Sequence, residues 1–132
     1  MNNEQTFLDY CNEMMRLAIP LFDKEMDKYG LTKIELGQGI DFLGPPHPVG
    51  EAWLTEPYRI YAKAGNSQLG TDDIVQITIC PAVGWKPLLS VSSTRLDPVM
   101  FETTYSAGKD IVMIKEKIDE CFARLIAPPL AQ

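Results

Sequence analysis

The sequence predicts an α+β fold: a single, mostly antiparallel sheet of four to five strands, with N- and C-terminal helices packed on one face. Two observations lead to this prediction. Both ends of the chain have the apolar spacing of amphipathic helices, and the middle contains strand-length segments in which apolar and polar residues alternate. Because 132 residues are enough to bury a core without metal or disulfide, we expect one domain over residues 1–132.

The centre of the sheet is predicted from two apolar segments. In residues 74–79, apolar side chains alternate with Gln76 and Thr78, so one face of the strand is apolar and the other polar. Residues 88–91 show the same period of two. The glycine and prolines of the intervening 81–87 indicate a connecting loop.

The first helix is predicted over residues 5–28. Its apolar stripe comprises Leu8, Cys11, Met15, Ala18, Phe22 and Met26. Pro20 falls on the polar side of this helix, so we expect a kinked helix that curves around the sheet. Two helices meeting at residues 18–20 are the alternative, and Gly30 is placed to end the helix.

Three further segments follow. Residues 31–43 keep their apolar residues on one side across two glycines, which permits either a bulged long strand or a tight hairpin. Residues 44–56 are rich in proline, so we expect a loop through which no strand forms. Residues 58–64 alternate again and are predicted to form a strand with a polar outer face.

The chain ends with a strand and a helix. Residues 99–105 contain β-branched and aromatic types, so a strand is favoured there over a short helix begun by Asp97-Pro98. The last helix is predicted over residues 110–126. On its outer face, oppositely charged residues lie four positions apart: Lys115 with Asp119, and Glu120 with Arg124.

Charge and hydropathy restrict the class of partner. The net charge is −6, and residues 1–73 carry twelve Asp and Glu against six Lys and Arg, whereas residues 74–132 carry six of each. This distribution argues against binding to nucleic acid, whose phosphates need clustered cations, and favours a protein partner with a basic surface. We expect no membrane partner and a cytoplasmic location, because neither a long apolar segment nor a secretory signal is present.

Residues with catalytic or metal-binding chemistry are few. Cys11, Cys80 and Cys121 lie in apolar contexts, so we expect three reduced, buried thiols without an intramolecular disulfide. His47 is the single histidine, and the sequence contains neither Cys-x-x-Cys nor Gly-x-Ser-x-Gly. These features predict no catalytic residues, no metal and no cofactor, and they favour a protein that is not an enzyme.

Large aromatic residues in the predicted loops suggest binding to a partner instead of catalysis. Trp53 and Trp85 fall in predicted loops, and interface hot spots are enriched in Trp, Tyr and Arg. We therefore predict a partner-binding surface that contains Trp85, Trp53, His47 and Tyr61.

The leading hypothesis is a small, acidic, non-enzymatic protein-binding module with an inhibitor, immunity-type or chaperone/adaptor role. An unpaired sheet edge also favours a homodimer over a monomer. The alternative is a small-molecule-binding protein, or a weakly specified enzyme, with a pocket between sheet and helices. The predicted lining of that pocket is Met14, Met15, Phe22, Tyr58 and Phe122.

Overall fold

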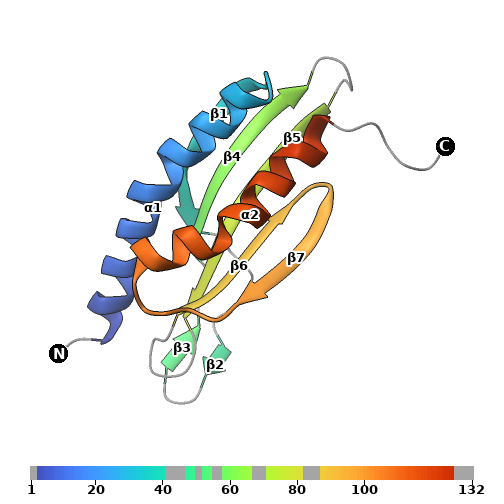
Figure 1. Cartoon of the computed structure of the whole chain (residues 1–132). Coiled ribbons are helices and arrows are strands. Elements are labelled where there is room, and N and C mark those ends of the chain that lie inside the picture. The colour runs from blue at the N-terminus through green and yellow to red at the C-terminus, as the bar shows by residue number, and fades with distance from the viewer. Residues whose placement is uncertain are drawn as a thin grey trace.

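The computed structural model describes residues 3–40, 47–49, 52–54, 58–66, 71–81 and 87–126. It is an α+β structure, as predicted, with a five-stranded antiparallel sheet in the order β1-β4-β5-β6-β7 (Figure 1). The sheet strands are β1 (Thr32–Ile40), β4 (Tyr58–Asn66), β5 (Thr71–Pro81), β6 (Pro87–Ser93) and β7 (Leu96–Phe101). A separate two-stranded sheet joins β2 (His47–Val49) to β3 (Ala52–Leu54), and the helices are α1 (Asn3–Lys28) and α2 (Ala107–Ile126).

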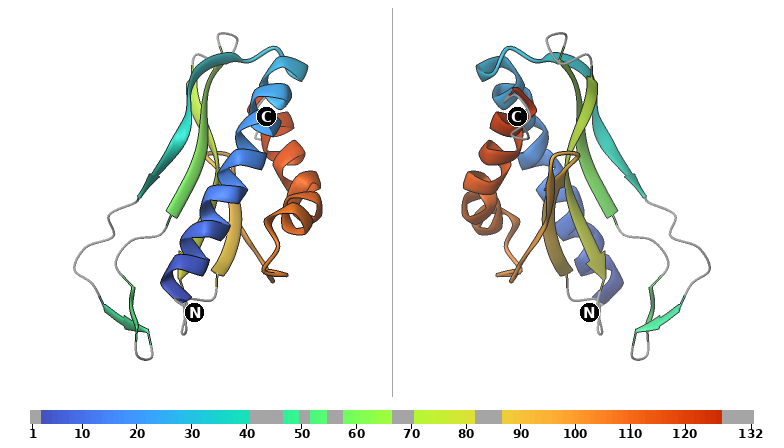
Figure 2. Two further views of the ribbon diagram at one scale, coloured as in Figure 1. Left: turned by 90° about the vertical axis from the view of Figure 1, so that its left-hand side faces the viewer. Right: turned by 90° about the vertical axis from the view of Figure 1, so that its right-hand side faces the viewer.

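Both helices cover the same face of the sheet, which confirms the predicted packing (Figure 2). Helix α1 packs over β1 and β4, and α2 packs over β5, β6 and β7. The helices also contact each other along their length. The opposite face, here called the open sheet face, is covered by neither helix (Figure 2).

The core lies between the helices and the sheet. The alternation in β5 buries Val75, Ile77 and Ile79 completely, and β5 is the central strand of the sheet, as predicted. From above, Phe22 of α1 and Phe122 of α2 meet with ring centroids 5.7 Å apart. Fully buried side chains with them include Met14, Met26, Ile60, Leu89, Val91, Ile114 and Ile118.

Helix α1 runs through Pro20 without a break, so the alternative of two separate helices is wrong. Pro20 and Arg16 are both exposed, so a proline at this position is compatible with a continuous helix, because water can reach the carbonyl that the proline leaves without an amide partner. Gly30 ends the helix with a φ of 65°, and the amide of Leu31 donates to the Met26 carbonyl at 2.9 Å. This closure turns the chain directly into β1.

Strand β1 is the bulged long strand rather than the hairpin, and both glycines, Gly37 and Gly39, lie within it. The irregularity is not at the glycines, because the register with β4 shifts between Lys33 and Glu35. Ile34 lies at this shift, and 45% of its surface is exposed although it was predicted to share the apolar side.

The prediction that no strand forms in residues 44–56 is wrong. Within it, β2 and β3 pair antiparallel, with Pro48 opposite Trp53 between two outer pairs. In an antiparallel ladder, every second pair of opposed residues exchanges no backbone hydrogen bonds. The middle pair of this hairpin can be such a pair, and proline, which has no amide hydrogen, is then tolerated there.

The strand predicted over residues 99–105 is shorter than expected and shifted, since β7 ends at Phe101. The next residues instead surround Asp110, which is fully buried in the first turn of α2. Its Oδ1 accepts from the amide and hydroxyl of Thr104 at 2.9 and 2.7 Å, and its Oδ2 accepts from the hydroxyls of Thr103, at 2.6 Å, and Tyr10. Tyr105 completes the reversal with a φ of 64°.

This buried network joins α1 to the start of α2. Burial acts to raise the pKa of Asp110, but the hydrogen bonds from Thr103, Tyr10 and Thr104 outweigh it and hold that pKa below its usual range. Burial, followed by the hydrogen bond to Asp110, raises the pKa of Tyr10. The pair therefore consists of a neutral phenol donating to a carboxylate.

The predicted pairing of Lys115 with Asp119 within α2 gives way to a contact between helices. The Asp119 carboxylate accepts from Lys28 Nζ at 2.8 Å and from the Tyr29 hydroxyl at 3.0 Å. The spacing of four residues predicts the pairing within α2. In the structure, Lys28 and Tyr29 at the end of α1 donate to Asp119 instead.

Truncating the core contact between strand and helix is expected to destabilise the protein strongly. Ile77→Ala and Phe122→Ala should each lower the free energy of unfolding by roughly 2–5 kcal/mol, because each leaves a cavity among fully buried neighbours. Urea unfolding followed by circular dichroism measures the change. Thr78→Ala on the open sheet face is the matched control, with an expected loss below about 1 kcal/mol. Equal losses at positions 77 and 78 would contradict the packing.

Replacing the buried carboxylate is expected to change how stability depends on pH. Because folding lowers the pKa of Asp110, its stabilising contribution is present above the unfolded pKa, near ~3.9, and is lost as pH falls through the folded value. Asp110→Asn should therefore cost about 2 kcal/mol at pH 7, with a cost that shrinks toward pH 3. Urea unfolding across this range, with Asp9→Asn on the exposed side of α1 as control, tests the sign. A cost independent of pH would contradict it.

Candidate functional site

The β1–β4 and β5–β6 connections, in which three of the four predicted site residues fall by sequence, join strands at the same end of the sheet. Tyr58 begins β4 opposite Ile40 of β1 and Ile79 of β5, and the β5–β6 ladder ends nearby with Pro81 opposite Pro87. The β2–β3 hairpin extends beyond this end of the sheet and on the side away from the helices (Figure 2). The chain therefore brings two connections, β1 to β4 and β5 to β6, to the same end.

The four predicted residues differ in how far the structure describes them. His47 and Trp53 lie in the β2–β3 hairpin, where His47 pairs with Leu54 and Trp53 with Pro48. Trp85 lies outside the described residues. Tyr61 is described fully and lies on β4, three positions from the start of that strand. The expected grouping of all four side chains therefore remains a prediction.

Tyr61 lies on the open sheet face and is held on both sides. Its hydroxyl donates to Oε2 of Glu35 at 2.5 Å, and this hydrogen bond raises the pKa of Tyr61. The guanidinium carbon of Arg59 is 4.8 Å from the centre of its ring, within the range of a cation–π contact. The ring is thus fixed between a carboxylate and a guanidinium.

The contacts continue across the sheet. Arg59 Nη1 donates to Oε1 of Gln76 at 3.2 Å, and Nε2 of Gln76 donates to Oγ of Ser92 at 3.3 Å. The side chains that run across β1, β4, β5 and β6 in this way, here called the polar row, are Glu35, Tyr61, Arg59, Gln76 and Ser92. A fixed Tyr–Arg pair loses little side-chain entropy on binding, so the row is suited to recognise a partner.

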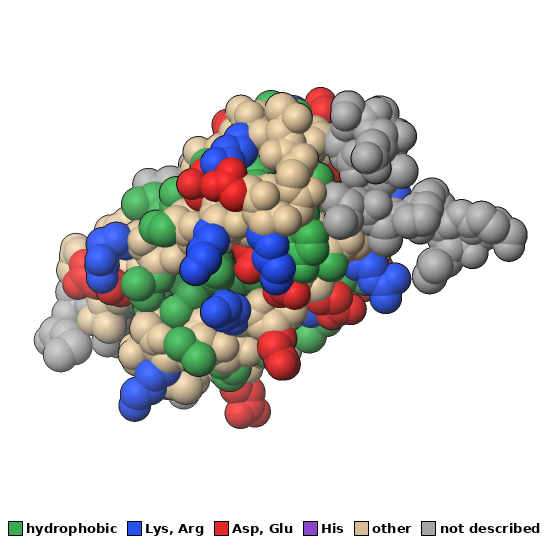
Figure 3. Space-filling model, turned by 45° about the horizontal axis from the view of Figure 1, so that its top comes forward, with side chains coloured by type: hydrophobic (Ala, Val, Ile, Leu, Met, Phe, Trp, Pro, Cys, Tyr) green, Lys and Arg blue, Asp and Glu red, His purple; other side chains and the backbone are tan. Residues whose placement is uncertain are grey.

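Half of the acidic residues of the first part of the chain lie on α1, on the helix side of the molecule. Asp23 and Asp27 of α1 each form an ion pair with Nζ of Lys33 at 2.8 Å, and Arg16 pairs with Glu13. In Figure 3, Lys and Arg side chains are interspersed with Asp and Glu over the side that carries the helices. The cations that neighbour these acids on the helix side therefore offset part of their charge.

The thiols follow the prediction in two of three cases. All three cysteines are free, and Cys11 and Cys121 are fully buried. Burial raises the pKa of the Cys11 thiol to about 12, and it also raises that of Cys121. The prediction of burial is wrong for Cys80, which is partly exposed because it lies on the outward side of β5. Neither buried thiol is suited to act as a nucleophile at neutral pH.

The chemistry available to the described part of the chain is limited. Within it, no three His, Cys, Asp or Glu side chains gather closely enough to hold a metal ion. Neither α1 nor α2 has the apolar length needed to cross a membrane.

The residues predicted to line a pocket between sheet and helices belong to the core or pack against it. Of its predicted lining, Met14, Phe22 and Phe122 are fully buried and belong to the core. Met15 and Tyr58 pack against that core. These residues serve packing, and the Tyr58 hydroxyl lies 3.3 Å from Oδ1 of Asn12, to which it donates.

Comparisons of the chain with protein-family models, with curated proteins and with solved structures gave no match.

The sequence prediction named Tyr61 but none of the other members of the polar row. The alternation of residues 58–64 already placed Arg59 on the same outward side as Tyr61, two positions away. The partners on β1 and β5 depend on strand order and register, which the alternation does not contain.

The exposures of the thiols predict an order of labelling. Cys80 should react first with a thiol reagent such as Ellman's reagent, whereas Cys11 and Cys121 should react only after unfolding, because burial blocks access and suppresses the thiolate. Mass spectrometry of the labelled peptides, with and without urea, measures the order. The Cys80→Ser variant is the control and should lose the fast phase. Early labelling of Cys11 or Cys121 would contradict the packing.

Proposed function

We propose that this protein is a non-enzymatic protein-binding module whose partner contacts the open sheet face and the β2–β3 hairpin. The observation that carries the proposal is the Tyr61–Arg59 pair, held by Glu35 and Gln76 on a sheet face that no helix covers. Fixed Tyr and Arg side chains are the types that contribute most binding energy at interfaces.

The neighbouring hairpin extends this surface. It lies off the end of the sheet on the open side, and its three-residue strands include Trp53. A partner that spans the polar row and the hairpin meets residues from six strands: β1, β2, β3, β4, β5 and β6. Trp85 and His47 belong to the same proposed surface.

The charge of the chain favours a basic partner. The excess of Asp and Glu is confined to residues 1–73, and long-range attraction of this kind raises association rates more than affinity. An inhibitor, immunity-type or chaperone/adaptor role in the cytoplasm, with the chain as a homodimer through a sheet edge, fits these properties. Each of these roles needs a stable small fold and a complementary surface.

Photo-crosslinking locates the partner surface. With p-benzoylphenylalanine in place of Lys63, two positions from Tyr61 and on the same outward side of β4, irradiation of intact cells should give an adduct with one partner, identified by mass spectrometry. The same group at Asp9, on the exposed side of α1, should give none. Adducts at both positions with the same proteins, or at neither, would contradict the proposal.

Binding of the purified partner then tests the individual residues. Tyr61→Ala, Trp53→Ala and Trp85→Ala should each weaken binding by about 2 kcal/mol, whereas Lys109→Ala on α2 should leave it unchanged. Added salt should mainly slow association. Surface plasmon resonance separates the two rates, and equal affinities across the variants would refute the assigned surface.

A further inference from the structure

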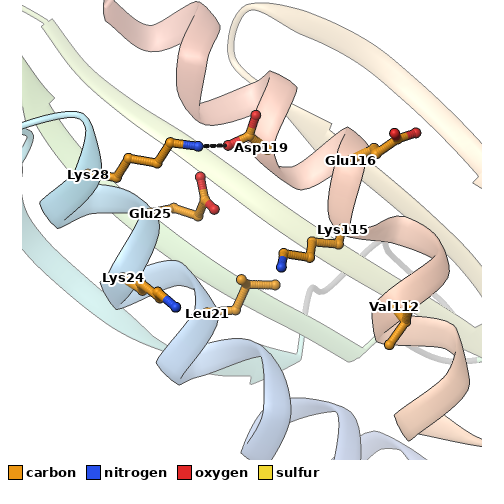
Figure 4. A pocket seen from close by; sticks show the side chains of 8 residues that line it. All are labelled: Leu21, Lys24, Glu25, Lys28, Val112, Lys115, Glu116 and Asp119. Carbon is orange, nitrogen blue, oxygen red and sulfur yellow. Dashed lines mark hydrogen bonds and ion pairs between the residues drawn. The ribbon is translucent and has the colours of Figure 1, made fainter.

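A groove between the two helices lies on the side away from the core. It has a volume of about 740 Å³, which falls within the range of roughly 300–1,000 Å³ of small-molecule sites. The second half of α1 forms one wall and α2 the other (Figure 4). Its lining residues are Leu21, Lys24, Glu25, Lys28, Val112, Lys115, Glu116 and Asp119.

Glu25 is a buried acid that lines this groove with an unused hydrogen-bonding atom. Only 6% of its surface is exposed, and its Oε2 has no hydrogen-bond partner among the described residues. Burial, and then the hydrogen bond with Asp119, raises the pKa of Glu25. Asp119 is in turn held by Lys28 at 2.8 Å. Leaving a buried oxygen unpaired is costly, and a ligand that donates to it offsets the cost.

Two lysines on opposite walls provide positive charge. Lys24 of α1 and Lys115 of α2 are both exposed, and neither forms an ion pair within the described ranges. Figure 4 shows their ammonium groups directed into the groove on either side of Leu21. Between them is room for an anionic group above an apolar floor.

The apolar part of the lining is unusually accessible. Val112 is 71% exposed although it is a large apolar side chain, and Leu21 is partly buried against the core. A ligand with a branched apolar group gains favourable burial against these two residues.

We propose that this groove binds a small organic carboxylate that carries an amide N–H, of the N-acyl amino acid type. The carboxylate lies between Lys24 and Lys115, the amide donates to Oε2 of Glu25, and the apolar side chain contacts Leu21 and Val112. The groove is on the helix side, opposite the open sheet face, so this inference does not depend on the proposed protein-binding function.

N-acetyl-leucine is the probe, because it has all three features. Added to the full chain labelled with ¹³C at methyl groups, it should give saturable shifts at the Leu21 and Val112 methyls in NMR spectra. N-acetyl-leucine amide, which lacks the carboxylate, and 4-methylpentanoate, which lacks the N–H, should each bind at least about fivefold more weakly. The absence of a saturable shift, or equal binding of the three compounds, would overturn the proposal.

Variants assign the contacts. Lys24→Met and Lys115→Met should each weaken binding of N-acetyl-leucine about fivefold or more, whereas Lys109→Met, on α2 outside the groove, should leave it unchanged. Glu25→Gln keeps an acceptor oxygen and should retain binding, and Glu25→Met should lose it while keeping the native circular dichroism. Unchanged affinity in Lys115→Met would overturn the assigned contact to the carboxylate. A peptide ending in leucine that binds tenfold more tightly than N-acetyl-leucine would overturn the assignment to a small molecule.

Discussion

The packing of two helices on one sheet face is the constraint on which the rest of this structure depends. Phe22 and Phe122 meet above the central strand, and the alternation in β5 places three fully buried side chains beneath them. Because one face of the sheet supplies the whole core, the other face is free to carry polar contacts across strands. In the part of the chain that the structure describes, the open sheet face, the edges formed by β1 and β7 and the outside of the helix pair therefore remain outside this core.

Much of this arrangement follows from local periodicity. The stripe of α1 predicts a helix over residues 5–28, and the period of two in residues 74–79 predicts a central strand with one buried face. Each period shows which side chains share one face of the helix or strand, and the apolar face is the one that packs into the core. Pro20 was compatible with a continuous helix for the same reason, since it lies on the exposed side.

The remaining features depend on contacts that a local pattern does not contain. Asp110 receives its hydrogen bonds from a helix at the other end of the chain and from residues that otherwise resemble a strand. Asp119 meets Lys28 instead of Lys115 because the helices lie side by side. Pro48 is tolerated in a hairpin because it occupies the middle of three pairs. The number of prolines in a segment does not show which position in a ladder each proline takes. The polar row could be predicted only from the order of the four strands that carry it, and local periodicity does not give that order.

The bond between Tyr10 and Asp110 also bears on the order in which the chain folds. Apart from the hairpin inserted between β1 and β4, every strand of the main sheet pairs with its neighbour in sequence, so the sheet assembles from local hairpins. Tyr10 and Asp110 are separated by 100 residues. Helix α1 therefore completes its packing only when α2 docks beside it. Until then its apolar stripe is covered by the sheet alone, so the chain is most prone to aggregate in the state in which the sheet has formed and α2 has not docked.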